Sequence, residues 1–171
     1  MQHGQALSEE QDPQRHLSPE GKAQIERTAI ALKKMSVSLD LIISSPKARA
    51  TESAKIIADT LSYPLNEIEI TDTLTPNSSP EDFINFLAGF KDRERVFVAG
   101  HLPSLHNIAL WLLCESCNIN VKFEMGGVLR IDVERLPTRQ GILQYYLLPE
   151  HLNIIQQNKT LVLKRHSKNT R

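Results

Sequence analysis

Two histidines and two arginines are the residues of this sequence best suited to chemistry on a phosphoryl group. His3 lies near the start of the chain, and His101 directly follows a predicted strand at 95–100. Arg49 lies in the first turn of a predicted helix, and Arg15 lies in a loop ahead of another helix. An arginine presents a fork of donors that matches phosphate oxygens, and a neutral imidazole can attack phosphorus and form a covalent intermediate. These side chains therefore predict a phosphate site, provided that the fold brings them together.

Alternating helices and strands would place these residues at one edge of a sheet. The apolar periodicity predicts helices over 19–36, 46–61, 80–90, 103–112 and 149–157, and strands over 39–44, 68–70, 95–100, 128–133 and 142–148. This alternation is typical of an α/β fold of three layers, with a mostly parallel central sheet flanked by helices. The final strand pair predicts a mixed edge. Ligands of such sheets bind at the carboxyl ends of the strands, where His101 lies.

Length and charge limit the possible classes of protein. The chain has 171 residues, with 20 Lys and Arg against 20 Asp and Glu. A zero net charge argues against a general nucleic-acid binder, and no apolar run approaches the ~18 residues of a membrane span. The N-terminus has neither the basic start nor the apolar core of a signal peptide. We predict one domain over 1–157, a basic C-terminal tail over 158–171, and a cytoplasmic protein with no nucleic-acid or membrane partner.

Cys114 and Cys117 form a C-x-x-C pair with three possible roles. A zinc site needs about four ligands, and neither a second Cys pair nor a close His pair accompanies these two. A redox motif would need a strand–turn–helix entry, which is missing here. We therefore expect two free thiols near the end of a helix, which is consistent with a cytoplasmic location.

Five short motifs occur in order along the chain: Gln2-His3-Gly4, Arg15-His16-Leu17-Ser18, Ser44-Ser45-Pro46-Lys47-Ala48-Arg49, Leu74-Thr75-Pro76 and Gly100-His101-Leu102-Pro103. Their order and spacing resemble the histidine phosphatase superfamily over about residues 2–155, and most of all its small SixA-like phosphohistidine phosphatases. The resemblance implies a phosphoglycerate mutase-like fold. It also implies that His3 is the nucleophile and that Arg49 and His101 bind the phosphoryl oxygens. Gln2, Gly4 and Arg15 would complete the phosphate-binding set.

The same resemblance implies a function. The protein would hydrolyse the N–P bond of a phosphorylated signalling or phosphotransfer protein through a covalent phosphohistidine, with no metal or cofactor. A histidine-containing phosphotransfer domain is the expected partner. Two alternatives stay open: a phosphatase for a small phosphate ester, and a weakly active phosphate-binding module.

Two departures from the superfamily pattern bear on the chemistry. Gln2 stands where the superfamily has arginine, so a neutral donor replaces a charged one. The loop at 73–79 contains no Asp or Glu that could serve as a general acid, and we expect structural roles for the flanking Asp72, Glu81 and Asp82. An ester leaving group requires a proton donor, whereas a protonated imidazole leaves readily. The missing acid therefore favours N–P cleavage.

A third departure concerns the first strand of the sheet. Only Met1 precedes Gln2, where the superfamily has a strand of about five apolar residues. Either the printed chain starts too late, or another segment fills the gap. Residues 160–164, which read as a strand followed by Arg165-His166, could supply it; a frayed basic tail is the preferred interpretation.

Overall fold

The computed structural model describes residues 1–116 and 119–157. Its central sheet has three parallel strands in the order β2-β1-β3, and two further strands form a separate antiparallel pair. The strands are β1 (Leu41–Ser44), β2 (Glu69–Ile70), β3 (Val96–Ala99), β4 (Val128–Asp132) and β5 (Ile142–Leu147). The predicted α/β fold with a parallel sheet is confirmed. The predicted mixed edge is wrong in one respect, because β4 and β5 pair with each other and are not part of the three-stranded sheet.

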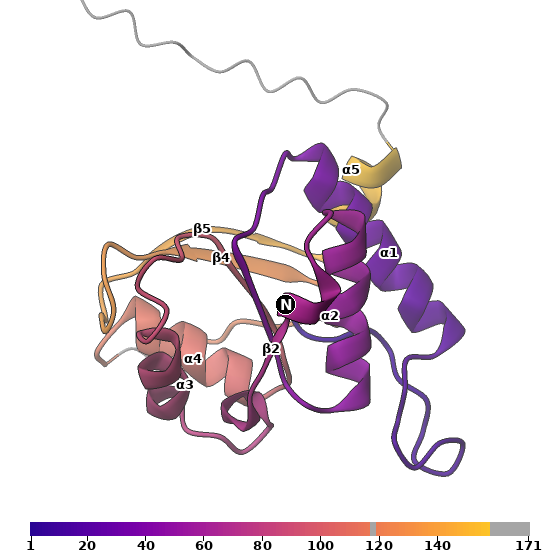
Figure 1. The fold of residues 1–171 in the computed structure, drawn as a ribbon, viewed down its shortest axis with the longest axis horizontal. Helices are drawn as coiled ribbons and strands as arrows, with labels where there is room; N and C mark the ends of the chain where they lie inside the picture. The colour runs from indigo at the N-terminus through magenta and orange to yellow at the C-terminus, as the bar shows by residue number, and fades with distance from the viewer. Residues whose placement is uncertain (117–118, 158–171) are drawn as a thin grey trace, which may run out of the picture.

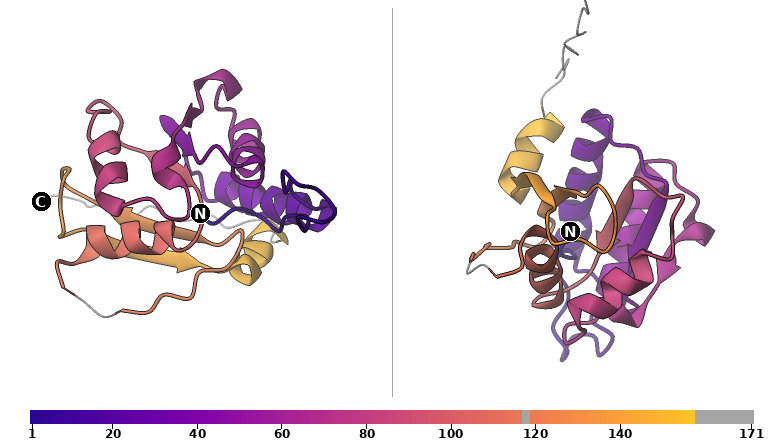
Figure 2. Two further views of the ribbon diagram at one scale, coloured as in Figure 1. Left: turned by 90° about the horizontal axis from the view of Figure 1, so that it is seen from below. Right: turned by 90° about the vertical axis from the view of Figure 1, so that its left-hand side faces the viewer.

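Helices cover both faces of the central sheet. The group α1 (Pro19–Lys34), α2 (Ala48–Thr60) and α5 (Pro149–Gln157) packs on one face, and α3 (Pro80–Leu87) and α4 (Ser104–Leu113) pack on the other (Figures 1 and 2). None of the helices in the described ranges is long and apolar enough to cross a membrane.

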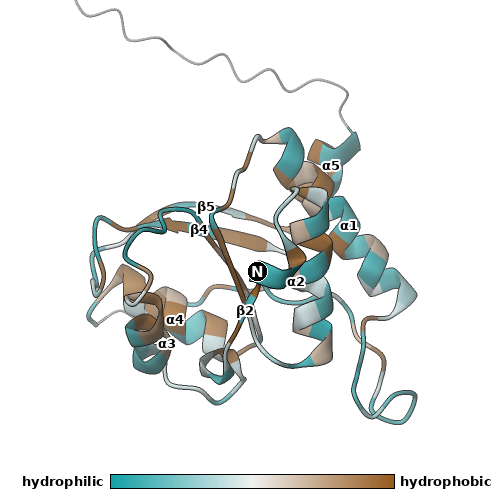
Figure 3. Ribbon diagram, in the orientation of Figure 1, coloured by the Kyte–Doolittle hydropathy of each residue, from teal (hydrophilic) through white to brown (hydrophobic). Residues whose placement is uncertain are grey.

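The side chains of the central strand β1 show why helices pack on both faces of the sheet. Side chains alternate between the faces of a strand, so Ile42 packs in the core of α1, α2 and α5, whereas Leu41 and Ile43 pack in the core of α3 and α4. All four residues of β1 are buried, as expected of a parallel strand covered on both faces. The ribbon coloured by hydropathy shows both hydrophobic and hydrophilic residues along α1 and α2 (Figure 3).

Two helices begin where the sequence predicts. Ser18 caps α1 by accepting a hydrogen bond from Gly21 N, and Ser79 caps α3 by accepting one from Glu81 N. In both cases proline occupies the first helical position, where no backbone N–H is needed.

The first three residues run beside the end of β3 and contact the turn that precedes β4. On one side, Gly100 N donates to Met1 O at 3.2 Å and His3 N donates to Gly100 O at 3.2 Å. On the other side, Gly126 N donates to Gln2 O at 3.0 Å. This segment therefore fills part of the gap expected beside β3 and fixes the backbone of His3. The alternative strand at 160–164 lies outside the described residues.

The expectation of free thiols is wrong at Cys114, which is disulfide-bonded. Cys117 lies outside the described residues. The cytoplasmic location, which was inferred in part from free thiols, stays a prediction.

Candidate functional site

Three of the predicted site residues converge beyond the ends of the central strands. Arg49 Nε, in the first turn of α2, donates a hydrogen bond to His3 Nε2 at 3.1 Å. The ring of His101, which follows β3, lies with its centroid 4.8 Å from that of His3. Both histidines are buried, with exposed fractions of 6% and 2%.

The hydrogen bonds of His3 fix its tautomer. Its Nδ1 lies 2.7 Å from Gly4 O, and a carbonyl oxygen can only accept, so Nδ1 carries the proton. The lone pair is then on Nε2, which accepts from Arg49. The nitrogen that can act as a nucleophile therefore faces the guanidinium.

Gly4 allows this arrangement because it lies against α1. A Cβ at this position would lie 2.8 Å from Gly21 O and 2.8 Å from Ile25 Cγ1. Its own N–H donates to Ser53 Oγ at 3.1 Å, and Ser53 Oγ donates to Arg49 O at 2.7 Å. The structure thus gives Gly4 a packing role, and Ser53 connects the backbones on either side of the His3–Arg49 contact.

His101 is held by a residue that the sequence analysis did not assign to the site. Its Nε2 lies 3.0 Å from the hydroxyl of Ser45, which directly follows β1 and is fully buried. Its Nδ1 is buried with no hydrogen-bond partner in the described part of the chain. Ser45 directly follows a predicted strand and begins the Ser-Pro motif before Arg49. Its position at a strand end could therefore have identified it as a site residue from the sequence.

Gln2 is buried beside His3, and the sequence analysis predicted a role for it in phosphate binding. Its Oε1 has no hydrogen-bond partner within residues 1–116 and 119–157. Its main chain accepts a hydrogen bond from Gly126, just before β4, and forms a bridge to Gly100, just after β3.

Both histidines are kept neutral by their surroundings. Burial lowers the pKa of His3 to about 4; the hydrogen bond to Gly4 O opposes this shift, and the charges of Arg49 and Arg15 add to it. Burial also lowers the pKa of His101 to about 3, with further lowering by His3, Arg49, Lys47 and Arg15. A neutral imidazole keeps its lone pair, and the surrounding positive charge attracts an anion. Lys47, the N-cap residue of α2, was not predicted as a site residue.

Two helix N-termini also point positive charge towards the site. Arg49 is the second residue of α2, and α4 begins at Ser104, shortly after His101. The N-terminal end of a helix carries about half a positive charge and unpaired N–H groups, which favour an anionic ligand.

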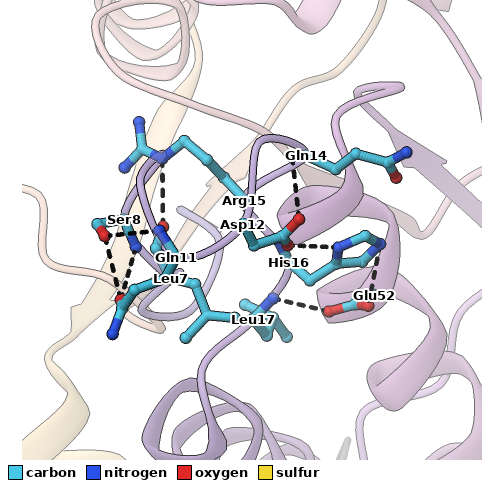
Figure 4. Close-up of polar contacts among 9 residues, drawn as sticks. All are labelled: Leu7, Ser8, Gln11, Asp12, Gln14, Arg15, His16, Leu17 and Glu52. Atoms are coloured by element: carbon cyan, nitrogen blue, oxygen red, sulfur yellow. Dashed lines mark hydrogen bonds and ion pairs between the residues drawn. The ribbon is translucent and has the colours of Figure 1, made fainter.

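Arg15 lies at the rim of the site and contacts neither histidine. Its Nε donates to Leu7 O at 3.3 Å, and the side chain is exposed (Figure 4). Its charge is nevertheless close enough to lower the pKa of His3, Arg49 and His101.

The loop that carries Arg15 is attached to α2 by a group of polar contacts (Figure 4). The carboxylate of Asp12 accepts from His16 N at 2.7 Å and lies 2.6 Å from His16 Nδ1, and these bonds lower the pKa of Asp12. Glu52 of α2 accepts from Leu17 N at 2.8 Å and lies 4.0 Å from His16 Nε2. The same helix thus positions Arg49 directly and Arg15 through the loop.

The loop after β2 contains hydroxyl groups, and none of the carboxylates that flank it is among the groups that shift the pKa of His3 or His101. Asp72 and Asp82 are exposed, and Glu81 lies 3.6 Å from Arg139. The charged groups that shift the pKa values of His3 and His101 are all basic. Across residues 1–116 and 119–157, no cluster of His, Cys, Asp and Glu could hold a metal ion.

Comparison with known proteins gives a family match for the first part of the chain. The family model of the histidine phosphatase superfamily (branch 1) matches residues 1–75. No curated protein matches the sequence closely enough to count as a relative.

Solved structures share the fold over most of the chain. A protein histidine phosphatase SixA complexed with tungstate is 24% identical, covers 89% of this chain and 96% of its own, and has a TM-score of 0.77. A structure described as a phosphohistidine phosphatase SixA from Agrobacterium tumefaciens is 21% identical over 87% and 95%, with a TM-score of 0.71.

A phosphoserine phosphatase from Entamoeba histolytica, in complex with 3-phosphoglyceric acid, is 15% identical over 88% and 96%, with a TM-score of 0.63. Residues 1–75 of this chain therefore match the histidine phosphatase superfamily in sequence, and the chain has the histidine phosphatase fold.

Proposed function

We propose that this protein is a phosphatase that hydrolyses the N–P bond of a phosphorylated histidine on another protein, with His3 as the nucleophile. The observation that carries the proposal is the geometry of His3: a buried, neutral ring whose Nε2 lies 3.1 Å from Arg49 Nε, beside His101, with Arg49 and Arg15 as the charged groups that lower its pKa. The family match and the SixA-like fold support it.

In the first step, Nε2 of His3 attacks phosphorus as the N–P bond of the substrate breaks. The bonding electrons go to the leaving nitrogen of the substrate. When the substrate ring is protonated on its other nitrogen, it departs as a neutral imidazole and needs no acid. This requirement fits a site in which Asp72, Glu81 and Asp82 are engaged elsewhere or exposed.

In the second step, a water oxygen bonds to phosphorus and the His3–phosphorus bond breaks. The electron pair returns to Nε2, a proton from the water goes to solvent, and inorganic phosphate is released. The bond from Nδ1–H to Gly4 O keeps the ring protonated, so His3 also leaves as a neutral imidazole. Arg49 and His101 bind the phosphoryl oxygens in both steps, and such catalysis is mostly positioning and charge neutralisation.

A phosphatase for a small ester is the second candidate, because the phosphoserine phosphatase from Entamoeba histolytica shares the fold. An ester oxygen is a poorer leaving group than an imidazole and requires a proton as it departs. The basic surroundings of His3 and His101 supply no carboxylic acid for that proton, so the N–P substrate is favoured.

The test is phosphate release from a phosphorylated histidine-containing phosphotransfer domain, compared with phosphoserine at equal concentration. We expect faster release from the domain, and labelled phosphate that stays on the protein after an alkaline quench. His3→Ala should abolish both signals, because the nucleophile is gone.

His151→Ala provides the matched control, since His151 is an exposed histidine whose ring accepts a bond from Leu148 N on another part of the surface. Faster release from phosphoserine would favour the ester phosphatase. Binding of phosphate without turnover would favour the binding module and contradict the proposal.

A further inference from the structure

The bond between Ser45 and His101 has a consequence for the state of the His101 ring. Burial, with the nearby positive charges, lowers the pKa of His101 to about 3, so the ring is neutral near pH 7. A neutral imidazole has one N–H and one lone pair, and the bond made by one nitrogen decides which form the other takes.

Ser45 Oγ has two polar neighbours that settle its orientation. Lys47 N donates to it at 3.5 Å, and His101 Nε2 lies 3.0 Å away. A hydroxyl has one hydrogen to donate. In the part of the chain that the structure describes, His101 Nε2 is the acceptor that lies within reach of that hydrogen.

The two tautomers of His101 differ in how many buried polar groups are left without a hydrogen-bond partner. If Nε2–H donated to Ser45, the serine hydrogen and the Nδ1 lone pair would both be buried without partners, since Nδ1 has none in the described residues. If Ser45 donates to Nε2, only Nδ1–H lacks a partner. Unpaired buried polar groups are costly, so the second arrangement is favoured.

We propose that Ser45 is a positioning residue that holds His101 as the Nδ1–H tautomer, so that Nδ1 donates its hydrogen bond to an oxygen of the bound phosphoryl group. The buried, unpartnered Nδ1 is then a prepared donor, whose partner arrives with the ligand. This inference rests on the proposed function for the identity of the ligand, but the tautomer is a property of the free protein.

The position of Ser45 explains how such a tautomer is maintained. The residue follows β1, and its backbone N–H donates to Ala99 O at 3.0 Å, just before Gly100 and His101. Thr51 Oγ1 donates to Ser45 O at 3.1 Å. Adjacent parallel strands thus fix both ends of the Ser45–His101 bond.

The experiment compares ring nitrogen NMR signals of His101 in the parent protein and in Ser45→Ala, each with and without tungstate or inorganic phosphate. We expect an Nδ1–H ring in the free parent, a shift of the Nδ1 signal when the anion binds, and a mixture of tautomers in Ser45→Ala. Anion affinity and kcat should each fall about tenfold, the value of one ordinary hydrogen bond.

Ser44→Ala is the matched control. Ser44 is the preceding residue, is also fully buried, and donates to a backbone carbonyl, that of Ser45, at 2.9 Å. The Ser44→Ala protein should lose about as much stability as Ser45→Ala, but it should keep the His101 tautomer and the activity. Ser45→Thr, which keeps the hydroxyl, should restore the Nδ1–H signal.

The outcomes separate this inference from the proposed function. An Nε2–H ring in the free parent, or equal tautomer signals in Ser45→Ala and Ser44→Ala, would overturn the role of Ser45 even in an active phosphatase. An Nδ1 signal that does not respond to the bound anion would overturn the donor role. A parent with the expected signals but no turnover of phosphohistidine would refute the proposed function alone.

Discussion

The candidate site has a buried side and an exposed side, which are built differently. On the buried side, His3 and His101 have exposed fractions of 6% and 2%; His3 is held by a hydrogen bond to the carbonyl of Gly4, and His101 by one to Ser45, which follows β1. On the exposed side, Arg15 is carried by a loop and contacts Leu7 O. Electrostatic interactions between buried groups are strong, so substitutions on the buried side are poorly tolerated. On the exposed side, solvent screens such interactions.

The difference suggests a division of tasks. The neutral, tightly packed histidines are suited to the bond-making steps, in which small displacements are costly. The exposed positive charge of Arg15 is suited to attracting and orienting an anion. Perturbing the buried side should therefore change stability and turnover together, whereas perturbing the exposed side should change binding alone.

The largest expected effect is the loss of stability in acid. The pKa values of His3 and His101 fall from 6.5 to about 4 and about 3 on folding, mainly through burial. Below pH 6.5 the unfolded chain binds protons that the folded chain does not. The stability is therefore fully present above pH 6.5 and is lost as the pH falls towards 4 and 3.

Urea unfolding between pH 4 and 8 measures this effect. The buried Met1 amine, with a pKa lowered by burial from 8.0 to about 5, acts in the same direction. The free energy of unfolding is plotted against pH for the parent and for His101→Asn. The difference between the two slopes is the contribution of His101. Equal slopes below pH 6.5 would show that the buried side is more hydrated than the structure indicates.

Gly4→Ala should give the next largest effect. The added Cβ would lie 2.8 Å from Gly21 O, which is backbone and can move only with α1. Overpacking of this kind costs about 1–3 kcal/mol. We expect a lower urea midpoint and, because His3 moves with Gly4, a loss of kcat.

Gly89→Ala is the control for this substitution. Its Cβ would come within 3.2 Å of Phe86 O, after α3 and away from the histidines. It should alter kcat little. A Gly4→Ala protein with parental kcat would show that the buried side tolerates displacement.

Arg15→Ala should give the smallest effect. Its guanidinium is exposed and contributes charge at a distance, so we expect kcat/KM to fall a few-fold, up to about tenfold, mostly through KM. Salt should reduce the difference from the parent, because exposed charges are screened. Arg27→Ala, an exposed arginine on α1, is the control. A large fall in kcat that salt does not alter would place Arg15 on the reacting phosphoryl group.

Local signals in the sequence determined much of the fold. The Ser-Pro pairs at 18–19 and 79–80 predict the starts of α1 and α3, because a capping side chain and a proline act within one turn. The apolar run of β1 predicts a strand covered on both faces, and it is buried throughout. The motifs around His3, Arg49 and His101 predict which side chains belong at the strand ends.

Other features depended on contacts between distant parts of the chain. No local pattern shows that β4 and β5 form a sheet of their own, or that residues 1–3 run beside the end of β3 and contact the turn before β4. The disulfide at Cys114 could not be predicted either, because the C-x-x-C spacing is compatible with a zinc site, a redox motif or free thiols.

Local sequence patterns identify the types of residue available for chemistry and the strands that end beside them. Contacts between distant parts of the folded chain set which nitrogen of His3 keeps its lone pair, hold His101 against Ser45, and leave Arg15 at the rim. The reason is physical. Helix caps and strand patterns are set by neighbours a few residues apart, whereas tautomers and pKa values are set by burial and by hydrogen bonds between residues far apart in the chain.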